Sequence, residues 1–372
     1  MAGIYIHIPF CKKACHYCDF HFSTSLKLKE KMVEAIIAET ILQKNFLGNE
    51  QVETIYFGGG TPSILDVNEL ESILNKIIEQ FSISSKPEIT LEANPDDLSI
   101  SKLKDIKSLG INRLSIGIQS FNDNFLTYLN RSHNSTEAKS VINNAQHVGF
   151  ENISIDLIYA IPNDDHKIWK EDLSLAMSLN VPHISPYSLT IEEKTVFGNW
   201  LKRNKINEVE DNFAAEQFEI LQETLFANNY EQYEISNFAR EKAYSKHNTN
   251  YWRQKKYLGL GPGAHSFNGN SRQFNVLNNP NYINSISKGI IPSTSDDLDL
   301  KDQTNEYILT SLRTIWGIDL NFLKNRYQYS IPQKAINQYL NSGHCMQKDN
   351  SLMLTKPGRL FADKIACDFF TT

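Results

Sequence analysis

One stretch near the start of the chain decides its fold and its chemistry: Tyr5-Ile-His-Ile-Pro-Phe-Cys-Lys-Lys-Ala-Cys-His-Tyr-Cys-Asp-Phe20. A short apolar strand leads into three cysteines, Cys11, Cys15 and Cys18, spaced as Cys-x3-Cys-x2-Cys. Thiolates hold iron–sulfur clusters, and a cluster normally takes four of them. Three clustered thiolates therefore predict a [4Fe–4S] cluster in which one iron is open to a chelating small molecule.

An open iron of this kind suits S-adenosylmethionine (SAM), whose amino and carboxylate groups can chelate it. An electron passed through the cluster then breaks a sulfur–carbon bond of SAM and gives a 5′-deoxyadenosyl radical. Tetrahedral zinc is the competing interpretation, with His16 or His21 as the fourth ligand. Zinc sites usually pair their ligands in two separated knuckles, and no second knuckle follows in this sequence, so the spacing favours the cluster.

The composition fits a reduced intracellular compartment. The chain has 372 residues, enough for one large and one smaller domain, and an odd number of cysteines, five. Cys345 and Cys367 stand apart from the cluster loop and are predicted to be buried apolar thiols. No signal peptide and no 18-residue apolar run occurs, so we expect a cytoplasmic protein. A net charge of −6 and a pI near 6.0 predict no surface for nucleic acid.

Strand and helix patterns alternate six times in the first half of the chain. Apolar, β-branched segments predict strands at residues 4–8, 52–57, 88–94, 113–118, 152–158 and 183–189. Helical patterns lie between them, and one is opened by Asp66 with Glu69 three residues later, as in a capping box. This order predicts a parallel sheet with right-handed crossovers. Six units are too few to close an eight-stranded barrel, so we expect an α/β fold with an open, partial (β/α)6 barrel.

Small and polar residues occur where the predicted strands end. Gly58-Gly-Gly-Thr61 follows the second strand, Glu92 and Gln119 close the third and fourth, and Asp156 lies in the fifth. In βα barrels the chemistry gathers at this end of the strands. Glycines let a ligand approach the backbone closely and can direct N–H groups at a carboxylate. Each side chain taken alone could equally be structural, but together they suit a cationic, ribose-bearing ligand.

Together these motifs resemble the oxygen-independent coproporphyrinogen III oxidase group of radical-SAM proteins. The resemblance spans essentially the whole chain and is carried by the cysteine loop, Gly58-Gly-Gly-Thr-Pro-Ser63, Leu91-Glu-Ala-Asn-Pro95 and Ser115-Ile-Gly-Ile-Gln-Ser-Phe121. It implies a radical-SAM barrel whose [4Fe–4S] cluster is held by Cys11, Cys15 and Cys18. It also implies SAM contacts from Tyr5, Tyr17, Gly59, Gly60, Thr61, Glu92, Gln119, Arg131 and Asp156. Without the resemblance, Arg131 would be read as a solvated surface residue.

Two departures separate the chain from the true oxidases of that group. The oxidases have a fourth cysteine where this chain has Phe20, and a long extension before the cluster where this chain begins its first predicted strand almost at Met1. We therefore expect the cluster and SAM site to be more open to solvent than in the oxidases.

A second motif, His247-Asn-Thr-Asn-Tyr251-Trp252, precedes a glycine-rich run that ends at Phe267. It is similar to the His-Asn-x-x-Tyr-Trp motif of radical-SAM haem chaperones of the HemW type. The resemblance implies haem contacts from His247, Tyr251 and Trp252, since imidazole can ligate haem iron and aromatic rings pack on a porphyrin face. Judged from the residues alone, a hydrogen-bonded histidine and core aromatic rings are the commoner roles.

The second half of the chain predicts further elements and a division into domains. A helix is expected at 208–229, a strand at 230–238, helices at 301–313 and 332–341, a strand at 351–355 and a last helix opened by Lys356. We predict a radical-SAM partial barrel at 1–240, a connecting segment with the His247 motif at 241–295, and a C-terminal α+β, winged-helix-like domain at 296–372. The acidic stretch 296–302 is expected to be a linker. Winged helices often bind DNA, but this linker and the mixed surface favour a packing or partner role.

The resulting hypothesis is a haem chaperone that binds SAM, a [4Fe–4S] cluster and haem, and delivers haem to acceptor haemoproteins such as membrane respiratory enzymes. The main alternative is an oxygen-independent coproporphyrinogen III oxidase (dehydrogenase) of porphyrin biosynthesis, which would abstract hydrogen from propionate side chains. An RNA-modifying radical enzyme should show a basic groove, which the sequence lacks. Catalytic turnover, a homodimer and attachment to a membrane through a partner stay open.

Overall fold

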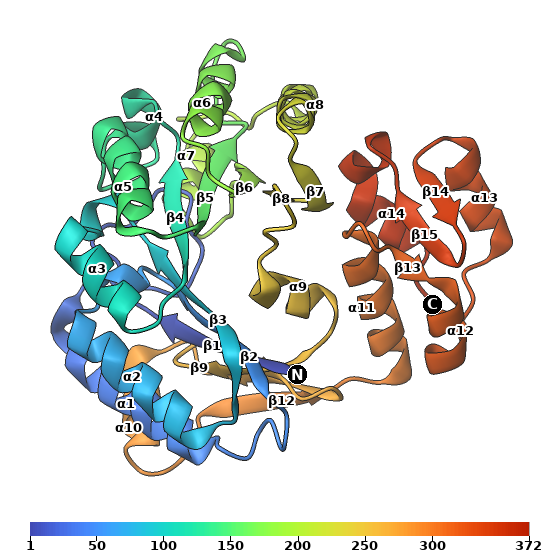
Figure 1. Ribbon diagram of the computed structural model, residues 1–372. Helices are drawn as coiled ribbons and strands as arrows, with labels where there is room; N and C mark the ends of the chain where they lie inside the picture. The colour runs from blue at the N-terminus through green and yellow to red at the C-terminus, as the bar shows by residue number, and fades with distance from the viewer. Residues whose placement is uncertain (372) are drawn as a thin grey trace.

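The computed structural model describes residues 1–371 and shows a curved sheet with helices along its outside and a smaller domain at the C-terminus (Figure 1). Parallel strands form the centre of the sheet: β1 (Ala2–Ile8), β2 (Val52–Gly59), β3 (Ile83–Ala93), β4 (Arg113–Gln119), β5 (Asn152–Tyr159) and β6 (His183–Ser188). They lie side by side in chain order. This confirms the predicted open (β/α)6 arrangement.

Helices connect these strands: α1 (Lys29–Leu42), α2 (Val67–Gln80), α3 (Ile100–Ser108), α4 (Asp123–Tyr128), α5 (Ser135–Val148) and α6 (Lys167–Ser178). The local sequence sets several of their ends. Asp66 and Glu69 form the predicted capping box of α2, and Asn134 and Glu137 form another at α5. Each box supplies partners for backbone N–H groups that the first turn leaves free. Gly149 ends α5 at φ 92°, a left-handed conformation that glycine adopts without a steric cost.

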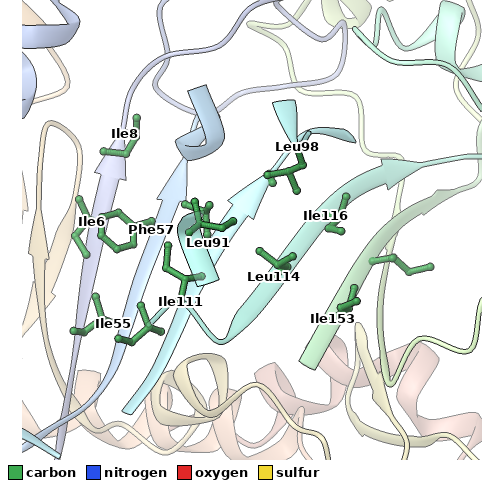
Figure 2. Packing of buried hydrophobic residues seen from close by; sticks show 14 of the residues in the cluster. Ile6, Ile8, Ile55, Phe57, Leu91, Leu98, Ile111, Leu114, Ile116 and Ile153 are labelled. Carbon is green, nitrogen blue, oxygen red and sulfur yellow. The ribbon is translucent and has the colours of Figure 1, made fainter. Parts of the chain in front are cut away.

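Alternation along the strands separates an apolar outer face from a polar inner face. The outer strand positions form one buried layer together with the loop residues Leu98 and Ile111; Figure 2 labels Ile6, Ile8, Ile55, Phe57, Leu91, Leu98, Ile111, Leu114, Ile116 and Ile153. The alternate positions of β2 and β3 carry polar groups that bond across the concave side. Tyr56 donates a hydrogen bond to Glu92, for example, and Thr54 bonds the ring of His247. The fold therefore gathers polar side chains inside the partial barrel.

The sheet continues on both sides of the parallel strands. β9 (Lys256–Leu260) pairs in parallel with β1, and β10 (His265–Phe267), β11 (Ser271–Asn275) and β12 (Ser293–Asp297) follow in antiparallel order. Beyond β6 lie β8 (Asn237–Ala239) and β7 (Glu231–Glu234). Residues 241–295, expected as a connecting segment, contribute these strands to the sheet, and β9 satisfies the backbone groups along the free edge of β1. The acidic stretch 296–302 ends β12 and begins the next helix, so it is not a free linker.

The remaining elements of the main domain are α7 (Val196–Lys202), α8 (Asp211–Ala227), α9 (Lys246–Trp252) and α10 (Asn279–Ile286), with short 3-10 turns at Leu26–Leu28, Pro62–Ile64 and Pro95–Asp97. The single strand predicted at 230–238 is instead the hairpin β7–β8, because the chain turns at Ile235 and Ser236. α9 lies on the concave side of the sheet (Figure 1). The backbone amides of Lys246 and His247 donate to the carboxylate of Glu88, which fixes α9 against β3.

The C-terminal domain contains α11 (Leu300–Leu312), β13 (Ile318–Asp319), α12 (Leu320–Tyr327), α13 (Gln333–Asn341), β14 (Cys345–Lys348), β15 (Ser351–Leu354), a 3-10 turn at Pro357–Phe361 and α14 (Ala362–Asp368). Helices around a small antiparallel sheet agree with the predicted winged-helix-like domain, although α12, β13 and β14 were not predicted. Arg313 lies 3.2 Å from the buried carboxylate of Glu234 and so ties this domain to β7. Across residues 1–371, no helix is both long and apolar enough to cross a bilayer.

Candidate functional site

The cysteine loop follows β1 and is anchored at several points by its backbone. Cys11 N donates to Ser23 O at 3.1 Å, and Ser23 N donates back to Pro9 O at 2.9 Å, which closes the loop on itself. His16 N donates to Leu129 O at 3.1 Å, so the loop is also held by the segment after α4. The three cysteines are partly buried. The loop is therefore pinned at the C-terminal end of the parallel strands, where βα folds place their chemistry.

Polar donors already face two of the thiols. Thr61 Oγ1 lies 3.4 Å from Cys11 Sγ, and Arg131 Nη1 lies 3.2 Å from Cys15 Sγ. Burial raises the pKa of Cys11 to about 12 and that of Cys18 to about 11. Metal binding removes such protons, and donors directed at sulfur stabilise the charge that results. This donor set fits an iron–sulfur cluster.

The remaining cysteines, Cys345 and Cys367, lie in the C-terminal domain, away from the cysteine loop. Cys345 is buried, as predicted, whereas Cys367 is exposed on α14, so the prediction that both are buried was wrong for Cys367. Short terminal helices leave such faces to solvent, which an isolated residue in a sequence does not reveal. Within residues 1–371, no three His, Cys, Asp or Glu side chains converge on one metal-sized point.

Arg131 joins the cysteine loop to the ends of two strands. Its Nη2 atom donates to Asn94 Oδ1 at 2.7 Å and to Gly117 O at 2.8 Å, while Nη1 lies 3.3 Å from the Tyr17 hydroxyl. Arg131 is partly buried, not the solvated residue that its helical neighbourhood suggests. The sequence motif gave no sign of Asn94 as its partner. A guanidinium in this position would neutralise negative charge that metal binding places on the cysteine loop.

Glu92 and Asp156 supply two carboxyl groups without a basic partner within ion-pair distance. Glu92 accepts hydrogen bonds from the Tyr56 hydroxyl at 2.7 Å and from Gly59 N at 3.2 Å. Burial, with a smaller contribution from nearby Asp156, raises the pKa of Glu92 to about 7. Burial likewise raises the pKa of Asp156 to about 6, against the opposing charge of Arg113. Two acids without an ion-pair partner fit a ligand that brings a positive charge.

The glycine run packs more closely than the sequence suggested. A Cβ atom at Gly60 would lie 2.7 Å from Phe10 O, and Gly59 has φ 107° with His7 beneath it, so neither position has room for a side chain. The expectation that the N–H groups here point at a ligand carboxylate is not met. Gly59 N donates to Glu92, Gly60 N to Ile8 O, and Thr61 N to Phe10 O. These bonds hold the loop against β1, because buried N–H groups need partners.

Gln119 ends β4 in an unusual conformation. Its φ is 66°, a left-handed value that residues other than glycine seldom adopt. The next two residues are held by Asp172 of α6, whose carboxylate accepts from Ser120 Oγ at 2.6 Å and from Phe121 N at 2.8 Å. Asp172 thus positions the turn that carries Gln119. The sequence analysis missed Asp172, and nothing in its helical surroundings distinguishes it from a surface acid.

A cavity of about 540 Å³ opens beside the cysteine loop. We call it the aromatic cavity. One wall is formed by Asp19, Phe20 and His21, another by Tyr251 and Trp252 of α9, and a third by Tyr257, His265, Phe267 and Arg272 of β9–β11. Phe20 is 72% exposed and Leu277, which also lines the cavity, is 67% exposed; no other large apolar side chain among residues 1–371 is as exposed as these two. The cavity is therefore bordered by apolar groups that the fold itself does not cover.

The three residues of the His247 motif occupy different positions. Tyr251 and Trp252 line the aromatic cavity, but His247 is buried behind them. Its Nδ1 atom lies 2.8 Å from Thr54 Oγ1 and its Nε2 atom lies 2.8 Å from the Tyr251 hydroxyl. Burial lowers the pKa of His247 to about 3. Both ring nitrogens of this neutral imidazole are occupied, so ligation of haem iron by His247 would require these bonds to break.

The comparisons with known proteins agree with this geometry. The Radical SAM superfamily matches residues 5–176, which include the cysteine loop, the glycine run and Asp156. Heme chaperone HemW of Bacillus subtilis (strain 168) is 35% identical over 372 residues, covering 98% of each chain. The chain belongs to the HemW family of radical-SAM proteins. Heme chaperone HemW of Lactococcus lactis subsp. lactis (strain IL1403) is 34% identical over 328 residues, or 88% of this chain and 85% of its relative. Membership implies a [4Fe–4S] cluster and SAM as cofactors.

The fold of this HemW family member also occurs in a solved structure. Coproporphyrinogen III oxidase (HemN) from Escherichia coli, a radical SAM enzyme, superposes with a TM-score of 0.85, covering 100% of this chain and 90% of that one. The two sequences are 20% identical, so the likeness establishes the fold and not the activity. It confirms the predicted radical-SAM architecture with a smaller C-terminal domain.

Proposed function

We propose that this protein is a haem chaperone that carries a [4Fe–4S] cluster and SAM, binds haem in the aromatic cavity, and delivers it to acceptor haemoproteins. Cys11, Cys15 and Cys18 would hold the cluster. When bound, the cluster and SAM supply one-electron chemistry. The acceptors would be haemoproteins that lack their cofactor, including respiratory enzymes of the membrane, which would bring the chaperone to the bilayer only through the partner.

The aromatic cavity is the observation that carries this proposal. Its volume falls in the range of about 300–1,000 Å³ typical of small-molecule sites. Aromatic side chains offer faces for a porphyrin, and Arg272 can pair with a carboxylate. The exposed Phe20 and Leu277 suit a cargo that must enter and leave readily. The names of the relatives in Bacillus subtilis and Lactococcus lactis, each a heme chaperone, support the same reading.

SAM would occupy the rim next to the cluster loop. Glu92 and Asp156 would face its cationic groups, since both acids are at least partly buried and neither forms an ion pair. The resemblance implies the further contacts from Tyr5, Tyr17, Gly59, Gly60, Thr61, Gln119 and Arg131. Two groups of hydrogen bonds already hold part of this rim: Arg131 contacts Tyr17 and Cys15, and Gly59 N donates to Glu92. The rim is thus arranged before any ligand binds, which lowers the entropic cost of binding.

The decisive experiment compares transfer with catalysis in one preparation. Protein reconstituted anaerobically with iron and sulfide is titrated with haem, then mixed with apomyoglobin as acceptor, and the growth of the holomyoglobin spectrum is followed. A parallel sample receives coproporphyrinogen III, SAM and reductant, and its products are separated by chromatography. Haem transfer without decarboxylated product is the expected result. Failure to bind haem, or repeated formation of protoporphyrinogen IX, would contradict the chaperone proposal.

A further inference from the structure

The aromatic cavity holds several side chains that could ligate haem iron, and their hydrogen bonds divide them. His7, His21 and His265 line it, together with the phenols of Tyr5 and Tyr257. Histidine and tyrosine are both known haem ligands. A ligand must present a free nitrogen or oxygen atom to the iron, so the partners of each candidate decide whether it can serve.

His7 has both ring nitrogens engaged, and His21 has one. His7 is buried, with Nδ1 at 3.2 Å from the Tyr5 hydroxyl and Nε2 at 2.9 Å from His21 O. His21 keeps one nitrogen but commits Nε2 to Asn279 Oδ1 at 2.8 Å. The tyrosine hydroxyls are bonded too: Tyr257, for example, accepts from Arg272 Nη1 at 3.1 Å. Burial raises the pKa of Tyr257, which keeps this phenol protonated and a poor ligand.

His265 differs from all of these. Its ring lines the cavity and makes no hydrogen bond to any residue from 1 to 371, and it forms a T-shaped contact with Phe274, with ring centroids 4.6 Å apart. This contact packs the ring, and neither ring nitrogen has a hydrogen-bond partner among these residues. Partial burial, together with the charge of Arg272, lowers the pKa of His265 and so favours the neutral imidazole that binds iron.

The hairpin that carries His265 also presents a positive charge on the same face. In the antiparallel pair β10–β11, His265 lies opposite Phe274 and Phe267 lies opposite Arg272. Residues two apart in a strand share a face, and opposite residues share it too, so all four side chains lie on one side of the hairpin. The Arg272 guanidinium packs over Phe267 at 5.3 Å and pairs with Glu306 of α11 through Nε, which leaves Nη2 without a bonded partner. One small hairpin thus offers imidazole, an aromatic face and a guanidinium.

We propose that His265 is the iron ligand for haem in the aromatic cavity and that Arg272 pairs with a haem carboxylate. This rests on the proposed function, since it names how the cargo of the chaperone is held. Phe20 and Leu277 would cover the outer edge of the porphyrin. His247 would act only as a positioning residue, because its bond to the Tyr251 hydroxyl orients one wall of the cavity.

The test uses two probes on the reconstituted full chain: haem and protoporphyrin IX, which lacks iron. His265→Ala should weaken haem binding by at least about tenfold and should shift the Soret band. A loss of about tenfold is the smaller of the losses seen when a residue that merely supports a metal ligand is removed. Protoporphyrin IX affinity should change by less than about twofold, because this probe needs no iron ligand. Added imidazole should restore the Soret position in His265→Ala. Arg272→Gln should weaken both probes but not the dimethyl ester of protoporphyrin IX, which has no carboxylate.

Controls separate this inference from the proposed function. His147→Ala removes an exposed imidazole on α5, outside the cavity, and should leave the haem spectrum unchanged. His265→Gln, with iron content and thermal unfolding measured alongside, shows that the protein still folds. If wild-type protein binds neither probe, the chaperone proposal fails. If the wild-type protein binds haem but His265→Ala keeps the wild-type Soret band and haem affinity, the assignment of His265 is overturned. A second variant, His21→Ala, tests the competing histidine: a change in the Soret band and haem affinity in this variant alone would also overturn the assignment.

Discussion

The Nη1 atom of Arg131 lies 3.2 Å from the Sγ atom of Cys15, although 116 positions separate the two residues. The same guanidinium reaches Tyr17 of the cysteine loop, Asn94 after β3 and the Gly117 carbonyl of β4. A single cation therefore connects the predicted cluster ligands to the strand ends that would bind SAM. Its charge lies close to a sulfur that would become negative on binding the cluster, so we expect it to act electrostatically as well as structurally.

Replacing Arg131 with Met should make the reduction potential of the cluster more negative. Nearby positive charge and donors to sulfur favour the reduced cluster, which carries more negative charge. A redox titration followed by EPR measures the potential. Arg131→Lys keeps a charge and should shift the potential less, and Arg203→Met changes an exposed arginine as a control. An unchanged potential in Arg131→Met, with full iron content, would show that the residue is only structural.

Each of Cys11→Ala, Cys15→Ala and Cys18→Ala should abolish stable cluster binding, because two thiolates cannot hold four irons against solvent. Iron and acid-labile sulfide are measured after anaerobic reconstitution. Cys345→Ala and Cys367→Ala serve as matched controls in the C-terminal domain and should retain wild-type iron content. A full cluster in any of the first three variants would remove that residue from the ligand set.

Much of this site follows from sequence because its signals are local. The cysteine spacing, the glycine run and the acids each lie a few residues from the end of a strand, and alternation identifies those strands. The capping box at Asp66 likewise needs only two residues three positions apart. A parallel sheet then brings the strand ends together without further information, since its carboxyl ends share one edge. Local pattern plus this topological rule places Glu92, Gln119 and Asp156 on the same side of the fold.

SAM binding should depend on the ionisation of Glu92. Its pKa of about 7 is raised by burial and by Asp156, so SAM affinity should fall as the pH drops below about 7 and the acid becomes neutral. Glu92→Gln should remove this pH dependence and cost roughly 1.5–3 kcal/mol, or about one to two decades of affinity. Calorimetry between pH 6 and 8 (a range spanning about one unit on each side) measures both effects. Asp156→Asn should weaken binding similarly.

Unfolding of the SAM-free protein offers an independent check on Glu92. A raised pKa means that the folded chain keeps a proton that the unfolded chain releases. The protonated Glu92 therefore contributes to the free energy of unfolding below about pH 4.5, and this contribution is lost as the pH rises through about 7. Glu92→Gln should flatten that part of the stability profile. The exposed Glu171→Gln is the control. If Glu92→Gln keeps the wild-type SAM affinity and the wild-type pH dependence of the free energy of unfolding, the role of Glu92 is purely structural.

His247→Ala should destabilise the protein more than it changes the iron environment of bound haem. The substitution leaves Thr54 and Tyr251 without their partner inside the barrel, a loss of about 1–3 kcal/mol for each buried polar group left unpaired. Chemical unfolding measures the loss, and the Soret band reports the iron ligand. Haem affinity should fall modestly, because Tyr251 loses its orientation. A Soret shift like that of His265→Ala would return His247 to the role of iron ligand.

The parts that sequence could not supply depend on distant pairings. β9 lies beside β1 although about 250 residues separate them, and no local pattern indicates which strand covers a sheet edge. His247 stands in a recognisable motif, yet its burial follows from Thr54 of β2 and from the Glu88 carboxylate that holds α9. The aromatic cavity itself is assembled from three segments of the chain. His265 was visible within the glycine-rich run, but only the hairpin register shows that it shares a face with Arg272.

The last prediction separates chaperone from oxidase. Phe20 stands where the oxidases of the resemblance have a cysteine, and it is the most exposed large apolar side chain among residues 1–371. We therefore expect no decarboxylation of coproporphyrinogen III by the protein with cluster, SAM and reductant. Phe20→Ala should instead speed haem dissociation, because the open edge of the porphyrin loses apolar cover worth about 25 cal/mol per Å². Stopped-flow transfer to apomyoglobin gives the rate. Ile290 is an exposed residue after α10 that does not line the cavity, so Ile290→Ala should not change that rate. Equal transfer rates in the wild type, Phe20→Ala and Ile290→Ala would place the haem away from Phe20. Repeated turnover of coproporphyrinogen III would identify an oxidase.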